Sequence, residues 1–396
     1  MKQIDVAIIG AGAAGMMCAL EARKRGRSVI LLDHAQKIGE KIRISGGGRC
    51  NFTNLDARAE RYLSQNPHFC KSALKRYTQH DFIKMVEQHN ISWFEKADKH
   101  ASGALFCAQS AGQIVDMLLS ELFALDVHPQ LESPATNIRQ TDQGFVLTVD
   151  HNELACSSLV IATGGKSIPK IGATGFGFKI AEQFGLKIVE PRPALVPLTF
   201  DETFRADQKS LSGSSVDVVV SCNGQSFKDA MLFTHRGLSG PAILQISSFW
   251  REGAGLSINM LPDTQLFPAL CDARQSHPKA AVHNVLSGHL PKKIATYFCQ
   301  KAGLQGNMAD LSNKRLQALA ELVQNWQIKP TGSEGYRTAE VTLGGVDTNE
   351  LSSKTMEASK VKGLYFIGET VDVTGWLGGY NFQWAWSSGW CAGQFV

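Results

Sequence analysis

The hydrophobic pattern at the start of the chain predicts a strand, a helix and a second strand. Residues 4–9 are mostly apolar and β-branched, which is typical of a buried parallel strand. A glycine-rich turn over 10–15 leads into an alanine-rich helix over 13–25. The apolar run 28–32 then predicts a second buried strand, which ends at Asp33. Together these segments form one β-α-β unit.

Beyond this unit the pattern changes several times. Residues 35–60 are polar and glycine-rich, which predicts a long loop, and long loops inside a domain are usually functional. Alternating runs and turn signals between 195 and 260 predict antiparallel strands, whereas 264–325 is mainly helical. The other predicted elements are helices over 68–90, 110–125 and 175–186, strands over 144–150, 157–163 and 364–367, and a last helix from about Gly379.

This order of elements predicts an α/β fold interrupted by an insertion. Sequence patterns typical of nucleotide-binding folds occur at both ends of the chain. Three prolines at 191, 193 and 197 mark the change to predicted antiparallel strands. The predicted domains are a split nucleotide-binding domain (1–190 plus 336–396), an antiparallel β domain (191–262 plus 326–335) and a helical insert (263–325).

Composition narrows the class of protein. The net charge is only +4, so bulk charge excludes a strongly basic nucleic-acid binder but allows a local basic patch. The nine cysteines are dispersed without a C-x-x-C motif, which gives no support to a zinc site and fits a reducing cytoplasm. Lys2 before an apolar stretch resembles a signal peptide, but the following glycine pattern favours a buried strand, turn and helix.

The turn after the first strand matches the dinucleotide fingerprint G-x-G-x-x-G. In this pattern Gly10 permits a tight turn, Gly12 lets a pyrophosphate approach the backbone, and Gly15 lets helix and strand pack closely. The start of the helix, including Ala13 and Ala14, offers free N–H groups to phosphate. Asp33 is expected to accept hydrogen bonds from the adenosine ribose.

Two later segments indicate that the nucleotide is FAD rather than NAD. One is a strand that ends in Ala162-Thr163-Gly164-Gly165, and the other is a strand that ends in Gly368-Glu369. A ligand contacted from both ends of the chain is an extended one, which favours FAD, and Glu369 is placed to bond a ribityl hydroxyl. The helix after Gly378-Gly379-Tyr380-Asn381 would direct its N-terminus toward the flavin ring, where negative charge collects on reduction.

Over nearly its whole length the sequence resembles the FAD-dependent oxidoreductases of the BaiN/YhiN type. The resemblance rests on three motifs in order, which are Ser45-Gly46-Gly47-Gly48-Arg49-Cys50-Asn51 with Thr53-Asn54, Phe233-Thr234-His235 with Ser239-Gly240-Pro241, and Val341–Val346 leading to Gly368-Glu369 and Gly378–Asn381. It implies bound FAD and a fold like those of glutathione reductase and fumarate reductase, with an inserted antiparallel β-barrel and a small helical domain. Residues 105–108 lack a proline that we associate with the family, which affects no catalytic assignment.

The expected cofactor-binding residues come from all of these segments. They are Gly10, Gly12, Ala13, Ala14, Gly15, Asp33, His34, Lys41, Ser45, Gly46, Gly47, Gly48, Arg49, Asn51, Ala162, Thr163, Gly164, Gly165, Gly368, Glu369, Gly378, Gly379, Tyr380 and Asn381. No metal ligand is expected.

The resemblance also implies reduction of activated carbon–carbon double bonds, one case being dihydrouridine formation in large-subunit ribosomal RNA. Residues 41–76 contain eight Lys or Arg against two acidic residues, so this stretch carries +6, more than the whole chain. Phosphate contacts from a basic stretch would suit RNA, although an ordinary solvated face that also binds the phosphates of FAD explains the charge equally well.

Four residues of the specific motifs are candidates for catalysis. Arg49 and the backbone N–H groups of its loop would stabilise negative charge on a substrate carbonyl, while Cys50, Tyr380 and His235 are candidate proton donors. Each donor has an ordinary structural alternative: Cys50 as a buried thiol, His235 as a hydrogen-bonded structural histidine, and Tyr380 as a stacking or capping residue.

The sequence is compatible with three functions. The first is a reductase that passes hydride from NAD(P)H through the flavin to a small molecule or to uridine in ribosomal RNA. The others are an oxidase or dehydrogenase of a small metabolite, and a non-catalytic RNA-binding factor that keeps FAD as structure. A second G-x-G-x-x-G after a strand is absent, so the sequence gives no separate NAD(P)H domain and NAD(P)H would dock transiently.

Overall fold

A computed structural model describes residues 2–96 and 103–396. Contacts among these residues divide the chain into two compact units, and each unit is described by itself. Unit 1 combines Met1–Pro193 with Glu340–Val396, and unit 2 is the continuous segment Ala194–Ala339. The two chain ends therefore share one unit, in agreement with a nucleotide-binding domain that is interrupted by an insertion.

The main sheet of unit 1 is mixed. Its order is β2-β1-β9-β8-β7, with β19 also paired to β9. Strands β1, β2, β9 and β19 are parallel to one another, whereas β8 pairs antiparallel with β9 and β7 pairs antiparallel with β8. The apolar runs predicted as buried strands form the parallel part, and the bounds are β1 Lys2–Ile9, β2 Val29–Leu32, β7 Thr136–Thr141, β8 Gly144–Val149, β9 Asn152–Ile161 and β19 Leu364–Phe366.

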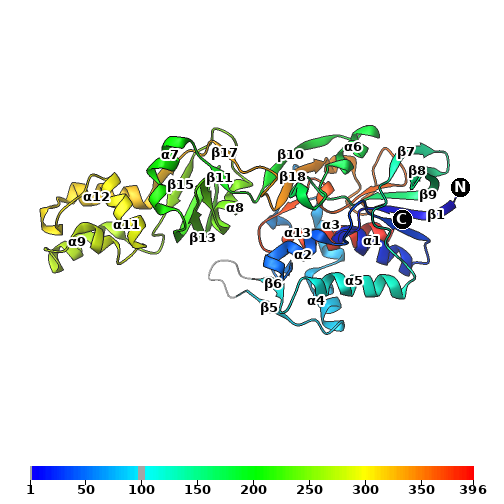
Figure 1. Ribbon diagram of the computed structural model, residues 1–396, viewed down its shortest axis with the longest axis horizontal. Helices are drawn as coiled ribbons and strands as arrows, with labels where there is room; N and C mark the ends of the chain where they lie inside the picture. Colours follow the sequence, from blue (N-terminus) through cyan, green and yellow to red (C-terminus); the bar gives the residue numbers. More distant parts are fainter. Residues whose placement is uncertain (1, 97–102) are drawn as a thin grey trace. The chain divides into compact units, whose positions relative to one another are not determined.

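Helices from both ends of the chain pack against this sheet (Figure 1). The first helix, α1, packs along the last helix, α13, and α13 also contacts α3 and β3. The backbones approach so closely that a methyl group on Gly389 of α13 would lie 2.4 Å from the carbonyl oxygen of Ala14. The unit's helices are α1 Ala13–Lys24, α2 Glu40–Ile44, α3 Cys70–Arg76, α4 Gln79–Gln88, α5 Gly112–Ala124, α6 Phe176–Gln183 and α13 Tyr380–Gly393.

Three small sheets complete unit 1, with orders β3-β6-β5, β20-β4 and β10-β18. The second joins an early segment of the chain to the segment before α13, because β20 pairs with β4 shortly before α13 begins. Their bounds are β3 Asn51–Asn54, β4 Tyr62–Leu63, β5 Trp93–Glu95, β6 Ala104–Cys107, β10 Ile188–Ala194, β18 Val341–Val346 and β20 Thr374–Gly375.

Unit 2 contains an antiparallel sheet and a group of helices that lie together at one end of the unit (Figure 1). Among the described residues the sheet has the order β16-β15-β12-β13-β14-β11-β17. Its strands are β11 Leu198–Thr199, β12 Ser215–Cys222, β13 Gln225–Phe233, β14 Gly237–Ser239, β15 Leu256–Asn259, β16 Trp326–Ile328 and β17 Gly332–Ser333. Its helices are α7 Glu202–Asp207, α8 Pro241–Ser247, α9 Leu266–Ser276, α10 Val282–Leu286, α11 Lys292–Lys301 and α12 Asn313–Gln324.

Most predicted segments agree with the observed elements in type, with two differences. Helices α7 and α8 lie within 195–260, which was predicted to form antiparallel strands. The stretch 35–60, predicted as a loop, contains α2, the short 3₁₀ turn Ser45–Gly48 and strand β3. These elements are too short for hydrophobic periodicity to reveal, and β3 is fixed by its partner β6, which lies about fifty residues later in the chain. The separation of unit 2 into a β domain and a helical domain stays a prediction.

An aromatic cluster holds α13 against α4 and β3. Trp386 is fully buried and stacks on Phe82 with ring centroids 4.2 Å apart, and its indole Nε1–H donates to the carbonyl oxygen of Phe52 at 2.8 Å. Trp386 is therefore part of the hydrophobic core of unit 1. Buried aromatic pairs of this kind carry much of the hydrophobic stabilisation of a core.

Replacement of Phe82 by alanine is expected to lower the free energy of unfolding by about 3–5 kcal/mol, because it removes the stacking partner of Trp386 and leaves a cavity. Urea unfolding followed by circular dichroism measures the effect. The matched control is Phe123→Ala, at a side chain that is 49% exposed, which should change the unfolding free energy by no more than about 0.5 kcal/mol. Equal effects of the two substitutions would contradict the prediction.

Candidate cofactor and active site

The glycine-rich turn has the geometry that its sequence predicts. Gly10 has a φ of +109°, and a methyl group on it would lie 2.4 Å from the carbonyl oxygen of Ala162. A methyl group on Gly15 would lie 1.9 Å from the carbonyl oxygen of Gly10, so helix and strand touch through their backbones. By contrast, a methyl group on Gly12 would meet no neighbouring atom within 4 Å among the described residues.

Space beside Gly12 is what a bound pyrophosphate needs. Gly12 is the N-cap of α1, and within the described residues no side chain caps it. The first N–H groups of α1, at Ala13 and Ala14, are therefore available at the positive end of the helix dipole. The free N–H groups and the open space at this turn therefore fit the phosphates of a dinucleotide.

Asp33 follows β2 and holds the glycine turn in place. Its Oδ2 accepts a hydrogen bond from the N–H of Ala11 at 2.7 Å, and its Oδ1 accepts one from Ala35 at 2.9 Å. A carboxylate has about four acceptor sites, so the predicted ribose contact remains compatible with both bonds. The next residue, His34, places Nε2 2.9 Å from the carbonyl oxygen of Gly172.

Glu369 and Lys41, both predicted to contact the cofactor, also contact each other. Lys41 Nζ lies 2.5 Å from Glu369 Oε2, and Glu369 Oε1 accepts from the N–H of Thr342 at 2.7 Å. The hydroxyl of Ser167 accepts from Lys41 and donates to Glu369. This network joins four separate chain segments, and the predicted ribityl contact of Glu369 stays a prediction.

The strand end Ala162–Gly165 lies against the same network. The N–H of Ala162 donates to the carbonyl oxygen of Ile9 at 2.8 Å, which sets the end of β9 beside the end of β1. A methyl group on Gly165 would lie 2.3 Å from Thr342 Oγ1 and 2.7 Å from Glu369 Oε1. The carboxyl ends of parallel strands are where doubly wound folds bind nucleotides, as the sequence predicts.

Strand β3, which follows the glycine loop of residues 45–48, is bonded to the residues just before α13. With its amide oriented to satisfy both ends, Asn51 accepts from the N–H of Gly379 at 3.1 Å and donates to the carbonyl oxygens of Thr53 and Leu105. Asn54 Nδ2 donates to the carbonyl oxygen of Gly378 at 2.8 Å. The N-terminal motif and the C-terminal motif are therefore bound directly to each other.

Asn381 fixes the segment that precedes α13. Its amide bonds both the N–H and the carbonyl oxygen of Gly375, at 2.8 and 2.9 Å. These bonds hold the loop before α13 in place, and the predicted cofactor contact of Asn381 stays a prediction. Behind it, buried Gln383 accepts from Thr53 Oγ1 at 2.6 Å. The partners of Asn54 and Gln383 lie more than 300 residues away in the chain, so no local sequence pattern indicates these bonds.

The catalytic candidates differ in exposure. Arg49 is exposed, with its guanidinium 5.7 Å from the ring centroid of Phe94. Cys50 is 0% exposed, and burial raises the pKa of its thiol well above the usual range. Tyr380 is 6% exposed, and burial raises the pKa of its phenol as well. His235 is exposed and belongs to unit 2, between β13 and β14.

Charged groups surround the phenol of Tyr380. Arg61 and Arg58 lower its pKa and Asp56 raises it, but burial has the largest effect, so the phenol is protonated at neutral pH. The carbonyl oxygen of Tyr380 accepts from the hydroxyl of Tyr62 at 3.0 Å, which orients the first turn of α13.

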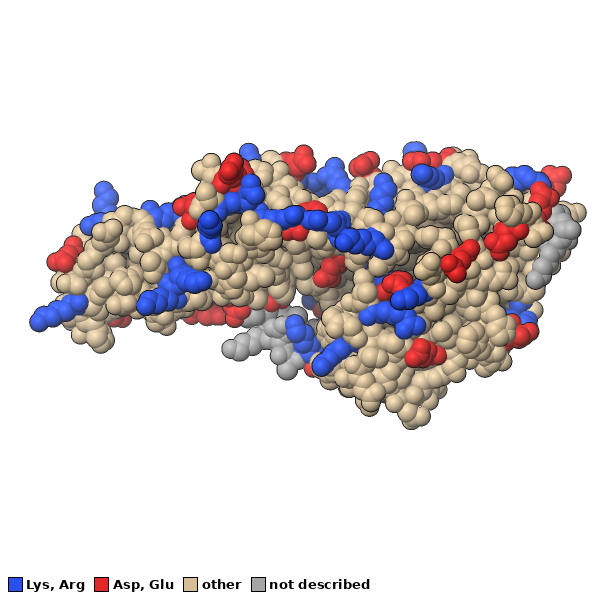
Figure 2. Space-filling model, in the orientation of Figure 1, with Lys and Arg blue, Asp and Glu red and all other residues tan. Residues whose placement is uncertain are grey.

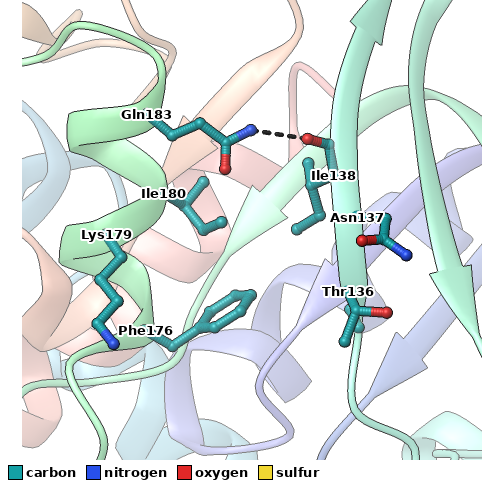
Figure 3. Close-up of a pocket in the computed structure, with 8 residues that line it drawn as sticks. Thr136, Asn137, Ile138, Phe176, Lys179, Ile180 and Gln183 are labelled. Atoms are coloured by element: carbon teal, nitrogen blue, oxygen red, sulfur yellow. Dashed lines mark hydrogen bonds between the residues drawn. The ribbon is translucent and has the colours of Figure 1, made fainter.

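A pocket of about 350 Å³ lies elsewhere in unit 1, between β7 and α6 (Figure 3). Gln183 Nε2 donates to the carbonyl oxygen of Ile138 across it at 2.7 Å. Its lining comes from strand β7, the residue before it and helix α6, and Lys179 is its charged residue. These residues are different from those predicted to bind the cofactor.

Comparison with known proteins places this geometry in a family. Residues 4–395 match the family described as HI0933-like protein Rossmann domain. The chain belongs to this family. It is thus a FAD-dependent oxidoreductase of the HI0933-like family, and the resemblance seen in its sequence motifs is confirmed.

Relatives of the HI0933-like chain cover it from end to end. The ribosomal RNA dihydrouridine synthase of Escherichia coli K12 is 52% identical over 100% of this chain and 98% of its own length. The ribosomal RNA dihydrouridine synthase of Haemophilus influenzae is 49% identical over 96% of this chain and 95% of its own. The 3-dehydro-bile acid delta(4,6)-reductase of Clostridium scindens is 27% identical over 98% of both chains.

A solved structure supports the fold. The 3-ketosteroid-delta4-(5alpha)-dehydrogenase of Rhodococcus jostii RHA1 matches with a TM-score of 0.51 and 15% identity over 99% of this chain and 97% of its own. The predicted fold class is confirmed. Within the described ranges, no helix is long and apolar enough to cross a membrane.

The empty space beside Gly12 gives a sharp prediction. Gly12→Ala should purify folded but with little FAD, because its methyl group meets solvent rather than protein and fills the place of the phosphates. The unfolding free energy of the FAD-free protein should stay within about 0.5 kcal/mol of the wild-type apoprotein. Flavin absorbance per protein and urea unfolding measure the two effects.

Two further variants serve as controls for Gly12→Ala. Gly10→Ala should destabilise the fold itself, since its methyl group meets the carbonyl oxygen of Ala162. Gly255→Ala in unit 2, where a methyl group approaches no closer than 3.5 Å, should leave both FAD content and stability intact. A yellow Gly12→Ala protein with full FAD occupancy would disprove the predicted position of the phosphates.

Proposed function

We propose that this chain reduces uridine in ribosomal RNA to dihydrouridine, with NAD(P)H as the electron source. The observation that carries the proposal is its 52% identity, over the whole chain, to a ribosomal RNA dihydrouridine synthase. The bile acid reductase relative, at 27%, makes reduction of an activated double bond in a small molecule the second candidate. A ribosomal RNA substrate agrees with the cytoplasmic location expected from the cysteines.

The reaction needs charge stabilisation and a proton as well as a hydride. Bound FAD supplies the hydride chemistry for one carbon of the uracil double bond. Negative charge then develops on the conjugated carbonyl oxygen, and the exposed guanidinium of Arg49 is the group that we assign to it. Strand β3, just after Arg49, is bonded through Asn51 and Asn54 to the residues before α13, so both ends of the chain contribute to this region.

We assign the proton to Tyr380 rather than to Cys50 or His235. The phenol is protonated at neutral pH because burial raises its pKa, and it starts the helix that follows Gly378 and Gly379. It gives its proton to the carbon next to the one that receives hydride, and the phenolate recovers a proton from water. The thiol of Cys50 has no exposed surface, which favours its structural interpretation.

Basic side chains supply the contact with a polyanion. Within 41–76, Lys41 is engaged by Glu369, and Arg58 and Arg61 share Asp56. Arg49, Lys71 and Lys75 are exposed. Figure 2 shows that basic side chains also gather at several places on the face in view. Such contacts favour binding of RNA through its phosphates.

The decisive experiment uses the purified yellow protein, NAD(P)H and ribosomal RNA from cells in which the gene is deleted. We expect mass spectrometry of nucleosides to show dihydrouridine after incubation, and its absence from the same RNA without NAD(P)H. An anaerobic NAD(P)H mixture that bleaches the flavin absorbance would establish the reductive half separately. A flavin that NAD(P)H and dithionite reduce but that leaves every uridine unchanged would reject the proposal in favour of a metabolite substrate.

Tyr380→Phe should lower the rate of dihydrouridine formation by about 10²–10⁴-fold, the usual contribution of a proton donor, while flavin reduction by NAD(P)H is unchanged. Because the pKa of Tyr380 is raised, wild-type activity should persist as pH rises to about 10, the ordinary pKa of a phenol. Cys50→Ala is the comparison variant and should retain turnover. Loss of turnover in Cys50→Ala with activity kept in Tyr380→Phe would reverse the assignment.

A further inference from the structure

An arginine and a tryptophan stack next to the segment predicted to bind the flavin. The guanidinium carbon of Arg61 lies 4.5 Å from the ring centroid of Trp376, and the indole is half-buried. The N–H of Trp376 donates to the carbonyl oxygen of Arg61 at 3.0 Å, so backbone as well as side chains join the pair. Arg61 comes directly before β4 and Trp376 directly after β20, so the two residues lie together at one end of the short ladder that these strands form.

The same contacts tie the Arg61–Trp376 pair to the candidate active site. Asn381, in the first turn of α13, donates to the carbonyl oxygen of Trp376 at 3.3 Å. Arg61 is close enough to lower the pKa of the Tyr380 phenol. Trp376 is also only two residues before Gly378 in the chain. The pair therefore borders the proposed proton donor.

Asp56 forms ion pairs with two arginines next to Trp376. Its Oδ2 lies 2.6 Å from Nη2 of Arg61, and its Oδ1 lies 3.0 Å from Nε of Arg58. One carboxylate between two guanidinium groups leaves a net charge of +1. The side chains of Arg58 and Arg61 are 57% and 25% exposed, so this charge faces solvent.

A second pair of the same chemistry shows what a purely structural stack looks like. Arg76 lies 5.2 Å from the ring centroid of Trp390, but it also covers Phe395 and donates to the carbonyl oxygen of Lys354 at 2.7 Å. Trp390 stacks in addition on Tyr77. That pair closes the far end of α13, about ten residues from the active-site end of the helix.

Reduction of a base within structured RNA requires that the base leave its stack. Unstacking costs a few kcal/mol, and enzymes that act on a base recover this by stacking RNA bases on aromatic rings or guanidinium planes. The Arg61–Trp376 pair offers both kinds of plane, with a net positive charge beside them.

We propose that Arg61 and Trp376 form a platform on which a nucleobase of the substrate RNA stacks beside the reacting uridine, while Arg58 binds an adjacent phosphate. This rests on the proposed function, and it identifies residues that bind the polyanion at the active site. The platform positions the RNA and takes no part in hydride or proton transfer.

The test compares RNA binding with chemistry in the holoenzyme. Trp376→Leu should raise the KM for unmodified ribosomal RNA roughly tenfold or more, with kcat at saturating RNA within about twofold, because stacking on an aromatic ring contributes to binding and not to turnover. Trp376→Phe keeps a ring and should recover most of the wild-type KM. FAD content and reduction by dithionite should match wild type in both.

Arg58→Gln and Trp390→Phe complete the set. In Arg58→Gln, the slope of log KM against the logarithm of salt concentration should fall by about 0.7–0.9, as expected for one lost phosphate contact. Trp390→Phe, in the structural pair, should leave the KM for RNA unchanged. If Trp376→Leu fails to hold FAD, Arg61→Gln, which leaves the indole in place, provides the same test of the platform.

The outcomes separate this inference from the proposed function. Wild-type protein that forms no dihydrouridine overturns the proposed function and, with it, the platform. Wild-type protein that is active, with Trp376→Leu and Arg61→Gln showing a wild-type KM for RNA, overturns the platform alone. An equal rise in KM for Trp376→Phe, Trp376→Leu and Trp390→Phe would also reject it, because general destabilisation and not stacking would then explain the effect.

Discussion

The close backbone packing around the first turn of α1 is the constraint on which the rest of unit 1 depends. The helix touches the glycine turn through Gly15 on one side and the last helix through Gly389 on the other. A side chain at either position would meet a carbonyl oxygen at 2.4 Å or less. Because both contacts lack intervening side chains, the start and the end of the chain form one structure around an open helix N-terminus.

This arrangement determines how the site is assembled. Asn51 and Asn54 bond strand β3 to the residues just before α13, and the loop before α13 is also held by Asn381. Amide side chains suit this task because each one both donates and accepts, so it can bridge two backbone segments. Strand β3 and the residues before α13 are thereby held together.

The electrostatics of unit 1 are divided between the two parts of the site. At the strand ends, Lys41 and Glu369 neutralise each other, so this part carries little net charge of its own. At the start of α13, two arginines share Asp56 and leave a positive charge near Tyr380. This distribution of charge suits the proposed reaction. The positive charge near Tyr380 would attract a polyanionic substrate, and negative charge would develop on the substrate during reduction.

The sequence by itself determined the β-α-β unit, the glycine turn, Asp33 and the family, because each depends on periodicity or on residues within a short stretch of chain. The burial of the α12 face and of Trp386 was predictable for the same reason. Only the tertiary structure decided that Lys41 pairs with Glu369, that Thr53 pairs with Gln383, and that Arg61 stacks on Trp376. The partners in these pairs lie more than 300 positions apart, and no local pattern records a contact that exists only once both ends of the chain have folded together.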